Sequence, residues 1–194
     1  MGDVTRDEDW YGRTLGSEVR HEERTFYDTD WTEVLAEGAV FESCVFSGVR
    51  FNASRHEGAA YTNCVFRRCS FFDARFTGCK AVGSRFDDCT YGLLTVSGGD
   101  WSYTSWPGAR LGKAVFEDVR LREADLTGAR LDGAALTRCD LAGALLRGAS
   151  LTGADLRGST LPDLDPRTLA ATRGARIDLA QAAALAAGLG FDVG

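Results

Sequence analysis

The sequence predicts an all-β solenoid, a four-sided β-helix built from five-residue repeats, with a C-terminal helical cap. From Ala124 to Thr160 every fifth residue is leucine, and the residue two positions before each leucine is alanine or cysteine. The same register extends back to Phe26 without an insertion, giving 28 consecutive pentads up to Leu161. A period of five fits neither an α-helix nor a simple strand, and a fixed period marks stacked repeat units.

The geometry of extended chain explains the repeat. Residues two apart point to the same side, so the small residue and the large central residue of each pentad both face inward. Five residues supply one short extended piece and one corner, and four pentads therefore close one coil. Glycine gathers two residues after the centre, where a corner needs a permissive backbone. These glycines are Gly38, Gly48, Gly58, Gly78, Gly128, Gly133, Gly143, Gly148, Gly153 and Gly158.

Three segments follow from this register. Residues 1–18 show no period and carry many charges, with Trp10 and Tyr11 as the only aromatic side chains, so we expect an acidic, loosely docked N-terminal tail. Residues 19–163 form the β-helix, with a degenerate first repeat at its start. The five-residue register ends after Leu161, where Pro162 and Pro166 interrupt the backbone hydrogen bonds between coils. Residues 164–194 form the C-terminal cap and dimerisation segment.

The cap contains a predicted helix. Asp178 followed by Gln181 indicates a capping box, so a helix is expected over residues 179–187. Its apolar residues are too many for a solvated helix, and the open end of a solenoid must be covered. We expect the segment to cover the last coil and also to join two rods tail to tail. The expected dimerisation residues are Leu179, Ala183, Leu185, Ala186, Leu189 and Phe191.

Central residues twenty positions apart should stack along one wall. One wall receives an aromatic series that includes Phe26, Phe46 and Phe66. In another wall, small or polar residues occupy three central positions: Ala36, His56 and Val96. We expect this wall to be the least regular in its N-terminal half.

The composition favours neither catalysis nor metal binding. All six cysteines (Cys44, Cys64, Cys69, Cys79, Cys89 and Cys139) take the small inward position, so they are expected to be core fillers and free thiols. His56 lies at a centre and is expected in the core. No zinc-ligand spacing, phosphate-binding glycine loop or nucleophile motif is present, and a rod offers no dry pocket. We therefore expect no enzyme activity, no cofactor and no metal.

The N-terminal sequence and the hydropathy favour a cytoplasmic protein. The first residues are acidic, unlike a signal peptide, and no apolar run is long enough to span a bilayer. The net charge of −6 is unevenly distributed: residues 1–40 carry −7, whereas residues 41–161 carry +2.

Surface recognition is the remaining class of function. Carboxylates spaced regularly on a rigid rod could imitate the phosphates of a duplex and occupy a basic groove. The competing interpretation is that outward positions are polar only for solubility. Summed by wall, the net charges are −2, +1, 0 and −1, so no wall is uniformly acidic. The residues alone leave both interpretations open.

The unbroken pattern of a small residue, Asp or Asn, and a central leucine resembles the pentapeptide repeat family over about residues 19–163. Members of that family form right-handed quadrilateral β-helices, so the resemblance implies this handedness. Three stretches resemble its DNA-mimicking, gyrase-interacting members, which confer fluoroquinolone resistance. They are SRHEGAAYTNCVF around His56, LAGALLRGASLTGADLRG before the break, and GARIDLAQAAALAAGLG in the tail.

The resemblance implies a partner and a mode of action. The partner would be DNA gyrase or another type II topoisomerase, which a homodimer joined at its C-termini inhibits or protects against quinolones or another gyrase poison. No direct contact with nucleic acid or membrane is expected. The phosphate-mimic candidates are Asp100, Glu117, Asp118, Glu123, Asp125, Asp140 and Asp155. The alternative is a scaffold of the same fold that binds an unrelated protein, since fold does not fix function.

Overall fold

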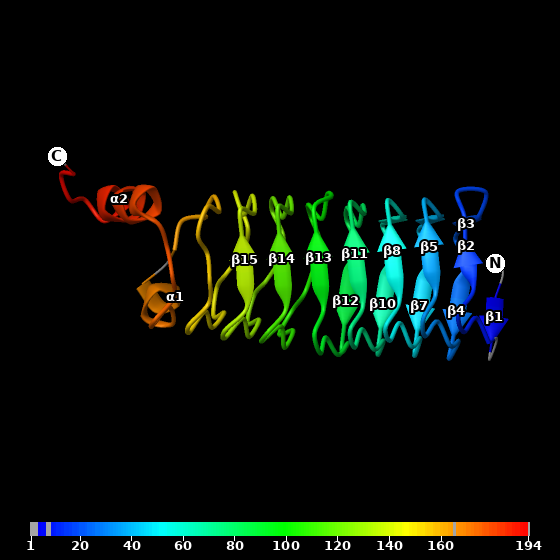
Figure 1. Ribbon diagram of the computed structural model, residues 1–194. Coiled ribbons are helices and arrows are strands. Elements are labelled where there is room, and N and C mark those ends of the chain that lie inside the picture. The colour runs from blue at the N-terminus through cyan, green and yellow to red at the C-terminus, as the bar shows by residue number, and fades with distance from the viewer. Residues whose placement is uncertain (1–3, 7–8, 165, 194) are drawn as a thin grey trace.

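The computed structural model describes residues 4–6, 9–164 and 166–193. The chain forms a parallel β-solenoid of stacked coils, with two short helices at its C-terminal end (Figure 1). Strand β1 (Val4–Arg6) and helix α2 (Leu179–Gly188) lie at opposite ends of the rod. The predicted solenoid with a C-terminal helical cap is therefore confirmed.

Three walls of the rod carry short parallel strands. The first wall is a five-stranded sheet of β1, β4 (Thr25–Tyr27), β7 (Val45–Ser47), β10 (Val65–Arg67) and β12 (Arg85–Asp87). A second wall is a seven-stranded sheet of β2 (Thr14–Leu15), β5 (Leu35–Glu37), β8 (Arg55–Glu57), β11 (Arg75–Thr77), β13 (Thr95–Ser97), β14 (Val115–Glu117) and β15 (Ala135–Thr137). A third wall contains β3 (Arg20–Glu22), β6 (Val40–Glu42) and β9 (Ala60–Thr62).

The fourth wall is joined by single parallel bridges. One series links Asp30, Arg50, Ser70 and Thr90, and a second links Arg110, Arg130 and Ser150. Partners lie twenty residues apart, which is four pentads, so each coil places equivalent residues directly over those of the next coil.

The core is a set of stacks along the rod axis. Phe26, Phe46, Phe66 and Phe86 are buried, with successive ring centroids 4.9, 4.9 and 4.7 Å apart and nearly parallel planes. The spacing follows the ~4.8 Å separation of hydrogen-bonded strands. The period of five thus places one inward-facing central side chain from each wall in every layer, as the sequence predicts.

Corners require left-handed backbone, and one of them admits only glycine. Gly99 has φ +89°, and a Cβ atom there would lie 2.0 Å from the carbonyl oxygen of Cys79. Most other corner glycines have free space around the same position; at Gly133, with φ +71°, no heavy atom lies within 4 Å.

The wall expected to be least regular is the seven-stranded sheet, so that expectation is wrong. Backbone hydrogen bonds of similar length join its coils. For example, the amides of Arg55 and Arg75 donate to the carbonyls of Val34 and Ser54 at 2.8 and 2.9 Å. Backbone groups form this ladder, and the size of the central side chain does not alter it. The polar centre, His56, is hydrogen-bonded inside the rod.

The expectation of a loosely docked tail is wrong for the described part of residues 1–18. Strand β1 pairs with β4, Trp10 stacks on Trp31 with ring centroids 4.8 Å apart, and Leu15 is buried. Partners are 21 residues apart as far as Leu15 and 20 apart from Arg20 onward. One extra residue between these two positions puts the first coil out of the five-residue register, so the register does not reveal it. Residues 1–3 and 7–8 lie outside the described residues.

The C-terminal segment continues the solenoid before it covers its end. Helix α1 (Pro166–Ala170) replaces one pentad, after which the amide of Leu151 donates to Ala171 and that of Arg176 to Ala154. The predicted helix is confirmed as α2, with the capping box formed by Asp178 and Gln181. No helix among the described residues is long and apolar enough to cross a membrane.

Candidate partner-binding surface

The aspartates that precede a central residue serve the corner next to them. One carboxylate oxygen accepts the amide proton of the residue two positions later, at 3.0 Å for Asp100, 3.0 Å for Asp125 and 3.1 Å for Asp140. Such a contact stabilises a turn locally. It explains why an aspartate recurs at this position independently of any partner.

The second oxygen of these aspartates commonly faces an arginine. Arg120 Nη1 lies 2.9 Å from Asp100 Oδ2, and Arg122 Nη1 lies 3.1 Å from Asp140 Oδ2. Partial burial raises the pKa of Asp100, but hydrogen bonds from Ser102 and Arg120 outweigh it, so the pKa lies below its ordinary value.

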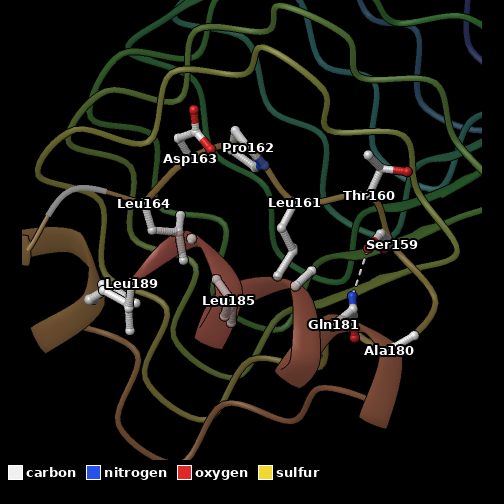
Figure 2. A pocket seen from close by; sticks show the side chains of 13 residues that line it. Ser159, Thr160, Leu161, Pro162, Asp163, Leu164, Ala180, Gln181, Leu185 and Leu189 are labelled. Atoms are coloured by element: carbon white, nitrogen blue, oxygen red, sulfur yellow. Dashed lines mark hydrogen bonds between the residues drawn. The ribbon is translucent and has the colours of Figure 1, made fainter. Parts of the chain in front are cut away.

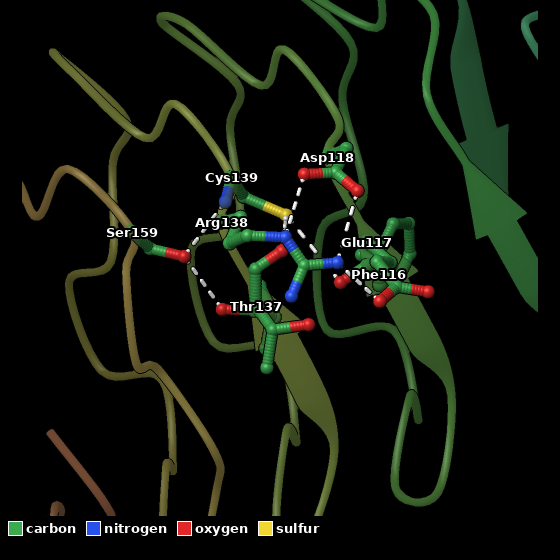
Figure 3. A network of polar contacts seen from close by, with 8 residues as sticks. Phe116, Glu117, Asp118, Thr137, Arg138, Cys139 and Ser159 are labelled. Atoms are coloured by element: carbon green, nitrogen blue, oxygen red, sulfur yellow. Dashed lines mark hydrogen bonds and ion pairs between the residues drawn. The ribbon is translucent and has the colours of Figure 1, made fainter.

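Arg138 neutralises two further candidates at one corner. Its Nε and Nη2 atoms donate to the two oxygens of Asp118 at 2.8 and 3.0 Å, and Nη2 also donates to Glu117 (Figure 3). The hydrogen bond from Arg138 lowers the pKa of Asp118. The twenty-residue spacing of Asp118 and Arg138 places them on adjacent coils.

Asp155 is buried and has two arginine partners. Its Oδ2 atom lies 2.7 Å from Arg157 Nη2 and 3.1 Å from Arg176 Nη2, and hydrogen bonding from Arg157 lowers its pKa. Asp155 therefore joins the last full coil to the segment after the proline break.

The seven phosphate-mimic candidates do not form one acidic surface. Five of them are in ion pairs, and the other two are Glu123, near the Tyr103 hydroxyl at 3.5 Å, and Asp125. Asp125 lies on the five-stranded wall, Asp155 continues the seven-stranded wall, and Asp100 and Asp140 continue the wall of β3, β6 and β9.

The acidity of the chain is concentrated in the first coils, of which only residues 1–18 were expected to form a tail. Residues 9–42 contain nine acidic and three basic residues. Two pairs of glutamates face each other in register, Glu22 with Glu42 and Glu37 with Glu57. We call these four residues the acidic ladder. Like charges directly opposite on neighbouring strands are destabilising. The acidic ladder therefore lowers the stability of the fold, and the fold does not require it.

The cysteines and His56 are hydrogen-bonded within the rod. The six cysteines are free, and their thiols donate to carbonyl oxygens, as Cys79 does to His56 at 3.2 Å. Burial raises the pKa of Cys79 and Cys139 to about 11 and lowers that of His56 to about 3. Among the described residues, no cluster of three histidine, cysteine or carboxylate side chains could hold a metal ion.

An apolar groove of about 520 Å³ separates α2 from the last coil (Figure 2). Leucines from both sides line it: Leu161, Leu164, Leu169, Leu185 and Leu189. Gln181 closes one side, since its Nε2 atom donates to the carbonyls of Leu156 and Ser159 at 2.6 and 2.7 Å.

The expected dimerisation residues divide between the groove and solvent. Leu179, Leu189 and Phe191 are 89%, 61% and 67% exposed. Ala183, Leu185 and Ala186 are half-buried. Within the single chain, α2 therefore leaves much of its apolar surface uncovered.

Comparison with known proteins identifies related sequences and folds. Residues 57–89, 108–138 and 124–162 match the family model of pentapeptide repeats, with eight copies. The pentapeptide repeat protein MfpA of Mycobacterium tuberculosis is 38% identical over 105 residues, which are 54% of this chain and 52% of that protein. The chain thus matches about half the length of this relative.

Solved structures share the fold at low sequence identity. Trypsin-treated QnrB1, a plasmid-mediated fluoroquinolone resistance protein, superposes with a TM-score of 0.58 at 21% identity, covering 98% of this chain and 99% of that one. HetL, a pentapeptide repeat protein involved in heterocyst differentiation regulation in the cyanobacterium Nostoc sp. strain PCC 7120, gives 0.53 at 17% identity, covering 89% and 84%. Together with the five-residue register and the solenoid that it builds, these matches identify pentapeptide repeats over residues 57–89 and 108–162 and show that the chain shares the fold of pentapeptide repeat proteins.

Proposed function

We propose that the protein binds a type II topoisomerase such as DNA gyrase at a surface that otherwise holds DNA. By occupying that surface it inhibits the enzyme, or protects it from quinolones or another gyrase poison. The protein acts as a binding module and not as an enzyme.

The observation that carries the proposal is a rigid rod with uncompensated carboxylates at one end. The acidic ladder holds its four glutamates as two facing pairs, one on the wall of β3, β6 and β9 and one on the seven-stranded wall, and the surrounding coils have few cations. A fixed array of negative charge suits a basic DNA-binding groove, because long-range attraction steers such partners together. We therefore assign the phosphate-mimic role first to the acidic ladder. Glu123 and Asp125 come second, and the five arginine-paired candidates last.

Dimerisation at the C-terminus is part of the proposal. A second copy would cover the exposed Leu179, Leu189 and Phe191 and extend the rod at the end opposite the acidic ladder. The seven coils between Phe26 and Leu161 alone give each body about 34 Å at ~4.8 Å per coil, so two rods present at least about 70 Å.

A supercoiling assay with purified gyrase tests the function. We expect the full-length protein to slow supercoiling in proportion to its concentration, or to restore supercoiling in the presence of a quinolone, and both effects should weaken as salt rises. If stoichiometric protein produces neither effect, the topoisomerase proposal is wrong.

The alternative remains a scaffold for another protein. HetL and QnrB1 share this fold, yet one takes part in the regulation of differentiation and the other in drug resistance. Affinity capture with immobilised protein from a lysate that contains gyrase separates the two. Retention of a different protein, together with an unaffected supercoiling reaction, would favour the scaffold.

A further inference from the structure

The fourth wall is basic in the C-terminal half of the rod. Its stacked segments, each with the corner that precedes it, are residues 107–113, 127–133, 147–153 and 167–173. They contain six basic residues and one acidic residue, Asp132. The bridges from Arg110 to Arg130 and from Arg130 to Ser150 align three of these segments. The exposed side chains of Arg110, Lys113, Arg130, Arg147 and Arg173 are named the basic strip.

Ion pairing among the described residues does not neutralise the basic strip. Eight arginines elsewhere on the rod are in ion pairs, namely Arg50, Arg75, Arg85, Arg120, Arg122, Arg138, Arg157 and Arg176. In the part of the chain that the structure describes, no carboxylate pairs with a cation of the strip. Arg110 and Arg130 also occupy in-register positions on adjacent coils. Two like charges placed this way are destabilising, so the strip is a second feature that folding alone does not explain.

Small and polar residues surround these cations. The corner column beside them consists of Gly108, Gly128 and Gly148, which have no side chains, and Ser150 and Thr152 add hydroxyl groups. None of the exposed large apolar side chains lies within the four segments.

This chemistry discriminates between classes of partner. Protein interfaces depend on buried aromatic or apolar anchors, which the strip lacks. Single-stranded nucleic acid is held by stacking on aromatic side chains, which are also missing among the exposed residues of the strip. Arginine, lysine and hydroxyl groups together are the usual contacts to phosphate oxygens of a duplex.

We propose that the basic strip binds the phosphate backbone of duplex DNA without sequence preference. Its four coils span about 14 Å at ~4.8 Å per coil. A duplex carries one charge per about 1.7 Å of axis, so this length presents enough phosphates for every cation of the strip. Glu57, the member of the acidic ladder nearest in sequence, is 53 residues from Arg110, which is more than two and a half coils or about 13 Å along the rod and exceeds the Debye length of about 8–10 Å in physiological salt. The overall negative charge therefore does not prevent binding.

The proposal goes beyond topoisomerase binding and departs from the expectation of no contact with nucleic acid. It gives the rod two charged surfaces of opposite sign, one suited to an enzyme's basic groove and one to a DNA segment. Either activity can fail in its own assay without affecting the other.

Fluorescence anisotropy with a labelled duplex and the full-length protein tests the strip. Between about 50 and 200 mM salt, we expect the logarithm of the binding constant to fall against the logarithm of salt with a slope near −4, from about 0.9 per contacted phosphate. In R110Q/R130Q the slope should become shallower by about 2, and binding at the lowest salt should weaken about tenfold or more.

The matched control is R20Q/R55Q, which removes two exposed arginines on other walls and changes the net charge equally. It should leave the slope unchanged, and circular dichroism should show both variants folded. Absence of duplex binding by the wild type, an equal loss in the control, or tighter binding to a single strand of the same length would each overturn the proposal. Sedimentation without DNA adds a further check. Salt-dependent self-association that R110Q/R130Q abolishes, with no duplex binding, would assign the strip to the acidic ladder of a second copy.

Discussion

The hydroxyl group of Tyr61 lies 2.7 Å from Nδ1 of His56 in the interior of the rod. On the other side of the imidazole, Nε2 lies 2.8 Å from Ser54 Oγ, and this hydroxyl donates to the carbonyl of Phe51 at 2.7 Å. Because the serine proton is engaged, Nε2–H must donate to Ser54, and Nδ1 accepts the proton of Tyr61. The chain of bonds therefore requires a neutral histidine, which agrees with the lowering of its pKa to about 3 by burial.

This arrangement predicts acid sensitivity. An unfolded histidine has a pKa of about 6.5, so the contribution of His56 to stability is complete above that pH. As the pH falls from 6.5 toward 3, the unfolded chain binds a proton that the folded chain does not, and stability should fall by up to about 1.4 kcal/mol per pH unit. Urea unfolding between pH 6.5 and 5 measures the slope. The variant H56F/Y61F should lose it, whereas Y61F alone should keep it; an identical slope in all three proteins would show that other groups cause it.

The corners predict two different outcomes for the same substitution. G133A places a methyl group in open space and should cost about 1 kcal/mol, because alanine disfavours positive φ. G99A places it against the Cys79 carbonyl and should cost more than about 4 kcal/mol or prevent folding. Thermal unfolding of the two variants measures the difference. Equal losses would mean that the backbone of the Cys79 coil shifts freely, contrary to the stacked register.

The acidic ladder should trade stability against activity. In E22Q/E37Q one member of each facing pair is neutral, so repulsion across the ladder falls and the melting temperature at low salt should rise. The same variant should inhibit gyrase less, since the array of charges is halved. D100N/D118N removes the same number of charges from ion pairs and should leave inhibition close to that of the wild type. If D100N/D118N loses more inhibition than E22Q/E37Q, the partner surface lies on the C-terminal coils.

The uncovered face of α2 predicts a dimer that depends on its leucines. L179Q/L189Q should shift the protein to a monomer in sedimentation equilibrium, because both side chains are more than half exposed in the single chain. L93Q/L145Q removes two exposed leucines from the rod body and serves as the control. A dimer that survives L179Q/L189Q, or a wild-type protein that is monomeric throughout, would contradict C-terminal association.

The fold was predictable because the repeat determines both which residues turn inward and which stack. The series from Phe26 to Leu161 needed no knowledge of side-chain contacts. The first coil was not predicted, because one additional residue between Leu15 and Arg20 moves Trp10 out of the five-residue register that contains Trp31. Register arguments fail wherever a corner has a different length, and the charged composition of this segment then resembles that of a tail.

The surface was harder to predict, although part of its organisation was present in the spacing. Asp100 with Arg120 and Asp118 with Arg138 are each twenty residues apart, which in a four-sided solenoid means neighbours on adjacent coils. A search for opposite charges at this interval would have identified these ion pairs. Summing charge by wall concealed the basic strip, because Asp30 and Glu33 at one end of the fourth wall offset Arg110 and Arg130 at the other.

The twenty-residue register makes the length of this molecule a quantity that changes only in whole steps. Deleting one complete coil within the leucine-rich part would rejoin equivalent corners and shorten the rod by about 4.8 Å. Such a deletion would leave each remaining layer with its four inward side chains. The molecule can therefore act as a ruler, graduated in coils, for the distance between two sites on whatever it binds.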